Sequence, residues 1–64
     1  MKRIVIKAPN VWGDRIKFSQ FDVVEVADDV ADILVKNKQA KITKDDLTHE
    51  IIMENDKPVL VAND

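Results

Sequence analysis

Residues 23–42 read VVEVADDVADILVKNKQAKI, and this stretch decides the fold. In its first part, Val24 and Val26 fall on one face of an extended chain and Val23 and Glu25 on the other, as in a strand. Apolar residues then recur at helical spacing from Val30, with Ala31 and Val35 broadening the stripe, and residues 39–43 return as a short strand. The stretch therefore predicts a strand, a helix over about 28–37 and a second strand, packed around Val24, Val26, Val30, Leu34 and Ile42.

The ends of the predicted helix carry suitable charges. Asp28 can accept from the free amides at the helix start, and Asp29 and Asp32 lie in the first turns, where negative charge is favoured. We therefore interpret these three acids as a cap rather than as a cation site. At the other end, lysines 36 and 38 suit the carbonyl terminus, and Asn37 is expected to take a left-handed cap.

Towards the N-terminus, the sequence predicts a strand over residues 2–8, which Pro9-Asn10 ends. Residues 11–18 hold the single glycine of the chain, and Gly13-Asp14 predicts a tight turn between two short extended pieces. Trp12 is then a loop aromatic beside this turn. Tryptophan is common at interface hot spots but also covers small cores, and both interpretations stay open.

The last third of the chain allows two interpretations. Two apolar runs, 51–53 and 59–61, flank a turn-rich segment that contains Pro58, as in a hairpin. Thr43 with Asp46, and Leu47 with Ile51, instead have the spacing of a helix over 44–54 followed by one strand. We favour the hairpin. The predicted fold class is α+β, with one domain over residues 1–64 and one helix packed on a small antiparallel or mixed sheet.

Length and composition narrow the function. A chain of 64 residues has room for one small core, and without cysteine it has no disulfide or cysteine-ligated zinc to stabilise it, which fits a reducing compartment. The formal charge of −2 has the wrong sign for a protein held to phosphates, so nucleic acid is a poor partner. The apolar run Ile4-Val5-Ile6 is too short for a secretory signal or a membrane span, so we expect a soluble chain that begins at its first strand and binds no membrane.

No pattern in the sequence predicts chemistry. Asp45 and His49 could share a metal ion only on a helix, and with Glu50 they lack a third ligand at matching spacing, so a solvated polar face is favoured. Ser19 and Thr48 have no activating context, and one glycine cannot build a phosphate-binding loop. We therefore predict no enzyme and no catalytic, cofactor-binding or metal-binding residue.

The run from Asp22 to Ile42 resembles a pattern of small proteins encoded among bacteriophage structural genes. Its positions are a V-x-V strand, an acidic cap, a V-A-x-x-L-[IV] helix and a strand that begins with alanine: Val24, Val26, Val30, Ala31, Leu34, Val35 and Ala40. Trp12-Gly13-Asp14 and Phe21-Asp22 correspond to the turn and the approach before the first of these strands. The chain departs from the pattern at Lys38, where glycine is common, and nothing after Thr43 matches it.

The resemblance covers about a third of the chain and implies a small virion-associated or head-accessory protein of a phage or prophage. Such a protein would be found in the virion or the host cytoplasm, would bind other virion proteins or further copies of itself, and offers no catalytic residue to carry over. We expect it to act by protein–protein contacts at the loop aromatic and at exposed strand edges. The predicted partner-binding residues are Trp12, Gly13, Phe18, Val59 and Val61.

Two other functions remain as alternatives. A small acidic inhibitor or regulator could bind a cationic site on a host protein through the carboxylates of residues 28–32 and 45–50. A nucleic-acid-binding module could use the locally basic N-terminal region, namely Lys2, Arg3, Lys7, Arg15 and Lys17.

Overall fold

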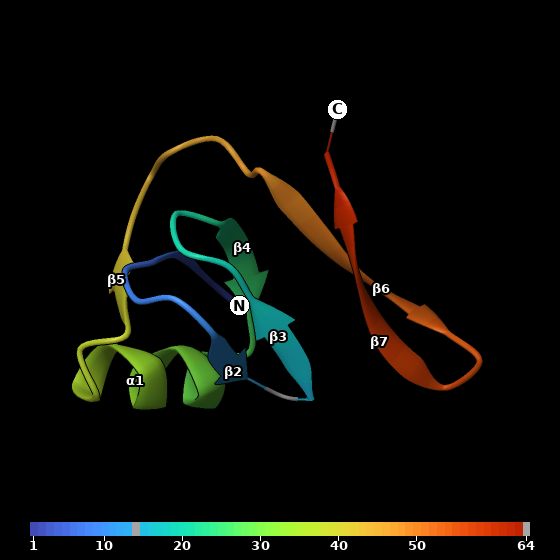
Figure 1. The fold of residues 1–64 in the computed structure, drawn as a ribbon, viewed down its shortest axis with the longest axis horizontal. Coiled ribbons are helices and arrows are strands. Elements are labelled where there is room, and N and C mark those ends of the chain that lie inside the picture. The colour runs from blue at the N-terminus through green and yellow to red at the C-terminus, as the bar shows by residue number, and fades with distance from the viewer. Residues whose placement is uncertain (14, 64) are drawn as a thin grey trace.

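The computed structural model describes residues 1–13 and 15–63, and in them it contains one helix and three antiparallel sheets (Figure 1). The predicted α+β class is confirmed. Among the described residues no helix has the length and apolar character needed to cross a membrane. The elements in chain order are β1 (Lys2–Ile6), β2 (Val11–Gly13), β3 (Ile16–Phe18), β4 (Val23–Val26), α1 (Asp28–Lys36), β5 (Ala40–Ile42), β6 (His49–Glu54) and β7 (Lys57–Ala62).

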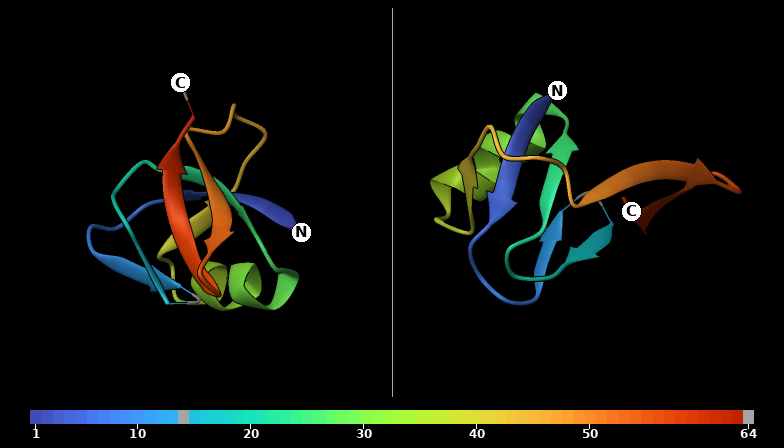
Figure 2. Two further views of the ribbon diagram at one scale, coloured as in Figure 1. Left: turned by 90° about the vertical axis from the view of Figure 1, so that its right-hand side faces the viewer. Right: turned by 90° about the horizontal axis from the view of Figure 1, so that it is seen from above.

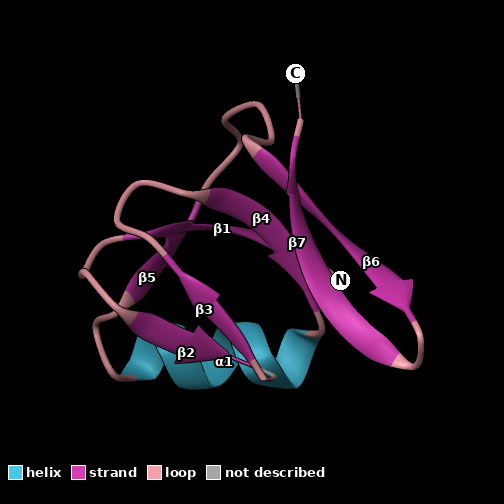
Figure 3. Cartoon of the chain, turned by 45° about the vertical axis from the view of Figure 1, so that its right-hand side comes forward, coloured by secondary structure: helices cyan, strands magenta, loops and turns pink. Residues whose placement is uncertain are grey.

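The central sheet has the order β4-β1-β5, so the two predicted strands of the strand–helix–strand unit flank β1. Ile4 lies between Val24 and Ile42, and Ile6 lies beside Ala40. The helix α1 packs below this sheet and beneath the β2–β3 hairpin (Figures 1 and 3). The first strand is two residues shorter than predicted, although the Lys7 amide still donates to the Gln39 carbonyl oxygen at 2.8 Å.

Among the residues that the structure describes, ten buried ones form one core: Ile4, Ile6, Val11, Ile16, Phe18, Val24, Val26, Ala31, Leu34 and Ala40. The prediction was right for Val24, Val26 and Leu34, and Val30 packs against the core while staying partly exposed. It was wrong for Ile42, whose side chain is 50% exposed. The reason is that β5 forms the edge of its sheet, so Ile42 has a neighbouring strand on one side only.

The helix begins as predicted, but its N-cap is Ala27, and no side chain of a described residue caps it. Asp28 and Asp29 lie in the first turn, where their negative charges interact favourably with the helix dipole although neither side chain caps the helix. The prediction that Asp28 caps the helix is therefore wrong. Its carboxylate lies 3.3 Å from the ammonium group of Met1 instead.

The helix ends in a Schellman motif centred on Lys38. The Gln39 amide donates to the Leu34 carbonyl oxygen at 2.9 Å, and the Lys38 amide donates to that of Val35 at 3.0 Å. The left-handed residue is Lys38, with φ of 60°, whereas Asn37 has φ of −83°. The prediction of a left-handed Asn37 is thus wrong by one residue.

The β2–β3 hairpin places Gly13 in a strand rather than in a turn. Gly13 pairs with Ile16, and Arg15 takes a positive φ of 68°, while Asp14 lies outside the described residues. A Cβ at Gly13 would lie 3.2 Å from a ring carbon of Phe18 and 3.4 Å from a methyl of Leu34. A side chain at Gly13 would therefore be crowded mainly by the ring of Phe18, across the same hairpin, while the side chains of α1 lie at ordinary contact distance.

The C-terminal hairpin forms as favoured, and the alternative helix over 44–54 does not. Strands β6 and β7 pair from His49 with Ala62 to Glu54 with Lys57. The two turn residues, Asn55 and Asp56, both have positive φ, as a type I′ turn requires. This hairpin, which we call the arm (residues 49–62), stands away from the rest of the molecule (Figure 2).

Candidate protein-binding surface

The arm carries apolar side chains on both of its faces. Ile51 and Leu60, which lie opposite each other, pack against the core. On the other face Ile52 lies opposite Val59, and Val61 follows beside them. Ile52 is 43% exposed and Val61 40%, while Val59 is half-buried. We call Ile52, Val59 and Val61 the outer apolar face of the arm.

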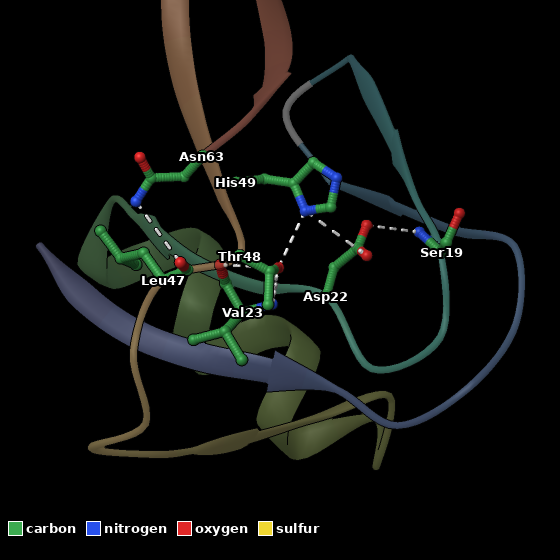
Figure 4. A network of polar contacts seen from close by, with 7 residues as sticks. All are labelled: Ser19, Asp22, Val23, Leu47, Thr48, His49 and Asn63. Carbon is green, nitrogen blue, oxygen red and sulfur yellow. Dashed lines mark hydrogen bonds and ion pairs between the residues drawn. The ribbon is translucent and has the colours of Figure 1, made fainter.

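A two-stranded hairpin by itself is marginally stable in water, so contacts at the base of the arm matter. Thr48 supplies most of them (Figure 4). Its hydroxyl oxygen accepts from the Val23 amide at 2.8 Å, and its own amide donates to the Val23 carbonyl oxygen at 3.1 Å. On the arm side, the Asn63 amide donates to the Thr48 carbonyl oxygen at 2.9 Å. One residue thus joins β4 to both strands of the arm.

Asp22 is the buried charged residue at this junction. One carboxylate oxygen accepts from the Ser19 amide at 3.0 Å, and the other lies 3.6 Å from Nδ1 of His49. The same Nδ1 lies 2.8 Å from the hydroxyl oxygen of Thr48 (Figure 4). The junction is therefore a connected polar network, and it holds the base of the arm against the body.

The network contains a hydroxyl, an imidazole and a carboxylate, but it lacks the arrangement of a catalytic triad. In a triad the acid and the nucleophile contact opposite nitrogens of the histidine, so that one nitrogen can take the proton of the nucleophile while the acid orients the ring. Here Thr48 and Asp22 both contact Nδ1. The Thr48 hydroxyl also accepts from the Val23 amide, so its position is set by main-chain bonding. This geometry is that of a structural junction.

Trp12 lies in β2 rather than in a loop, on the face of the hairpin opposite the core. It pairs across the strands with Lys17, and it is 64% exposed. Of the two roles left open by the sequence, the structure therefore excludes that of a buried core residue. Trp12 is available to a partner.

Gly13 and Phe18, which were predicted to bind a partner, are buried. Alternate residues of a strand point to opposite faces, so the residues next to Trp12 and Lys17 point into the core. In the folded chain Gly13 and Phe18 therefore offer no exposed side chain to a partner. Of the five residues predicted, only Trp12, Val59 and Val61 reach the surface.

Several carboxylates of the predicted acidic surfaces are engaged within the chain. Besides Asp28, the Asp32 carboxylate accepts from the Lys2 ammonium at 2.7 Å, and this hydrogen bond raises the pKa of Lys2 above its ordinary value of 10.5. His49 and Asp45 do not share a helical face, because His49 begins β6 while Asp45 lies in the preceding loop. His49 faces Asp22 instead.

Two cations of the basic N-terminal region are also engaged. Lys2 pairs with Asp32, and Arg3 lies 3.4 Å from Glu25 while donating to the Asp45 carbonyl oxygen at 2.9 Å. Ion pairing of this kind reduces the charge available for phosphate groups.

An open cleft of about 220 Å³ lies between the arm and the body. Its walls come from the N-terminus, β4, the loop before β6 and the start of β6: Met1, Glu25, Leu47, His49, Glu50 and Ile51.

Sequence reasoning missed Ile52, Phe21 and the Thr48 junction. The sequence did carry a signal for Ile52, because each strand has three consecutive apolar residues, 51–53 and 59–61. Successive side chains point to opposite faces, so each strand is apolar on both faces, and a two-stranded hairpin that packs one face on the core leaves the other exposed. Phe21 is 68% exposed and has a positive φ of 74°. Nothing in the local sequence marks Thr48, because its partner Val23 is 25 residues away.

No protein-family model, curated protein or solved structure matches the chain.

Proposed function

We propose that this protein is a non-enzymatic accessory subunit of a larger protein assembly and that it acts through protein–protein contacts. The observation that carries the proposal is the arm, which presents the apolar side chains of Ile52, Val59 and Val61 outside a core that is already complete. Apolar groups on a projecting hairpin gain free energy when a partner removes them from water. Trp12 supplies a second exposed anchor of the type common at interface hot spots.

The resemblance of residues 22–42 to small phage structural proteins supports a phage or prophage particle as the assembly. Neighbouring virion proteins, or further copies of this chain, are then the partners.

The two alternatives have less support. An acidic inhibitor would need free carboxylates, yet Asp28 and Asp32 are paired with Met1 and Lys2. A nucleic-acid-binding module would need free cations, yet Lys2 and Arg3 each contact a carboxylate.

The test is co-purification of the protein with the products of its neighbouring genes. We expect the wild type to be retained by one of these proteins, and Trp12→Ala or the arm variant Ile52→Ser/Val61→Ser to be lost from the complex with little change in the thermal midpoint. Ile33→Ala is the matched control, because Ile33 is 58% exposed but lies on α1. Retention of all variants alike would contradict the proposed surfaces. Unfolding of Trp12→Ala would show that the exposed ring is needed for folding, and it would contradict the role of Trp12 as an anchor for a partner.

A further inference from the structure

One edge of β6 has main-chain groups without partners. In an antiparallel pair, alternate residues bond the partner strand, and the residues between them direct N–H and C=O groups away from it. Glu54 and Lys57 flank the two-residue turn, and the Asn63 amide donates to Thr48, so the even-numbered residues of β6 bond β7. His49, Ile51 and Met53 therefore point their main-chain groups outwards, and within residues 1–13 and 15–63 these groups have no main-chain partner.

The outer edge of β7 differs from that of β6. Pro58 lies opposite Met53, so it is one of the outward-facing residues of β7, and it has no N–H to offer. Proline at such a position protects an edge strand from pairing with another chain. The arm thus has one protected edge and one open edge.

The open edge borders the cleft. His49, Glu50 and Ile51 all line it, although consecutive strand residues point to opposite faces. Three consecutive strand residues can line the same cleft only where the cleft runs along the edge of the strand. Glu25, on the opposite wall of the cleft, directs its main-chain groups away from β1. Val23 bonds Thr48 through its amide and carbonyl, and residues two apart in a strand direct these groups to the same side.

The lining of the cleft indicates which strand would fit. Met1, Leu47 and Ile51 provide apolar surface, and Glu25 and Glu50 provide carboxylates. The charge of Glu25 is partly neutralised by an ion pair with Arg3, whereas Glu50 has no ion pair with any residue that the structure describes. A segment with alternating apolar and basic side chains complements this lining. A second copy of β6 does not, since it would bring further glutamates against Glu50.

We infer that the cleft beside β6 is an acceptor site for an extended strand of a partner protein, with alternating apolar and basic side chains, which pairs with the open edge of β6. This inference rests on the proposed function, and it names the chemistry of one partner segment. Main-chain hydrogen bonds would provide the pairing, and Glu25 and Glu50 would select the basic side chains.

The test is residue-resolved amide hydrogen exchange of the full chain with a short, end-blocked peptide of alternating lysine and valine. We expect the Ile51 amide, which points outwards, to become protected when the peptide is added. The Ile52 amide, already bonded to β7, should change much less. The same peptide N-methylated at every amide cannot donate and should give no protection. Equal binding of both peptides would overturn strand addition, because charge alone would then explain the binding.

Charge selection is tested with Glu50→Lys. We expect this variant to bind the lysine–valine peptide at least about tenfold more weakly. Glu54→Lys is the matched control, because Glu54 lies on the same strand and face but outside the cleft, and it should bind like the wild type. Equal loss in both variants would overturn the role of the cleft. Protection of the Ile51 amide that rises with protein concentration alone would assign the edge to a second copy and overturn the inference.

These peptide measurements use none of the virion proteins that we propose as partners. Their failure therefore leaves the proposed function to be judged by the co-purification of Trp12→Ala, and loss of co-purification does not affect the peptide result.

Discussion

At the scale of single residues, Lys38 has a backbone conformation that suits glycine better than lysine. Its φ of 60° closes the Schellman motif after α1, and a left-handed conformation costs a residue with a Cβ roughly 1–2 kcal/mol. The chain therefore keeps the motif at the expense of some stability.

We expect Lys38→Gly to raise the free energy of unfolding by about 0.5–1 kcal/mol, because relief of the left-handed strain exceeds the extra entropy of glycine in the unfolded chain. Denaturant unfolding measures this change. Lys36→Gly is the control, since Lys36 is helical and the same replacement should lower stability by about 0.5–1 kcal/mol. A loss of stability in Lys38→Gly as well would contradict the proposed strain.

Local sequence revealed some single-residue roles and not others. It marked the turn at Asn55 and Asp56, because both residue types tolerate positive φ. It misplaced the role of Gly13, where an added Cβ would lie 3.2 Å from the ring of Phe18 in β3 and 3.4 Å from Leu34 in α1. Contacts of this kind depend on packing between elements, which no local pattern encodes.

At the scale of elements, periodicity was a reliable guide. Helical spacing located α1, and alternation located β4, because each pattern reflects one buried face. Alternation also holds in β2 and β3, where Val11 and Gly13 face Ile16 and Phe18 on the buried side. That pattern could have identified Phe18 as a core residue, had the two strands been aligned with Gly13 opposite Ile16.

The orientation of α1 leads to a prediction for Leu34, which is 3% exposed. We expect Leu34→Ala to lower the free energy of unfolding by about 2–5 kcal/mol, because it removes a central side chain and leaves a cavity beneath the β2–β3 hairpin. Thermal or denaturant unfolding would detect a change of this size. Ile33→Ala, at the exposed neighbouring position, should change stability by no more than about 0.5 kcal/mol. Equal effects of the two variants would show that the helix is turned differently.

At the scale of the whole molecule, the arm and the body meet at a junction made by few residues. Ile51 and Leu60 supply apolar contact, and the hydroxyl and amide of Thr48 form hydrogen bonds with the main chain of β4. The sequence predicted both strands of the arm but not its position, because position depends on Thr48 meeting Val23 across 25 residues. The cleft arises from that position, since its walls belong to both the arm and the body.

The junction predicts that Thr48→Val loosens the arm. Valine has nearly the shape of threonine but leaves the amide of Val23, a buried residue, without its acceptor, at a cost of about 1–3 kcal/mol. We expect amides bonded within the arm, such as that of Ile52, to exchange faster by roughly tenfold for each 1.4 kcal/mol lost, while those between β1 and β4 change less. Thr43→Val is the control, because the Thr43 hydroxyl accepts from the Asp45 amide, at 3.2 Å, at an exposed position. If the exchange rates of the arm amides and of the β1–β4 amides rise equally in Thr48→Val, the arm unfolds together with the body and does not open separately.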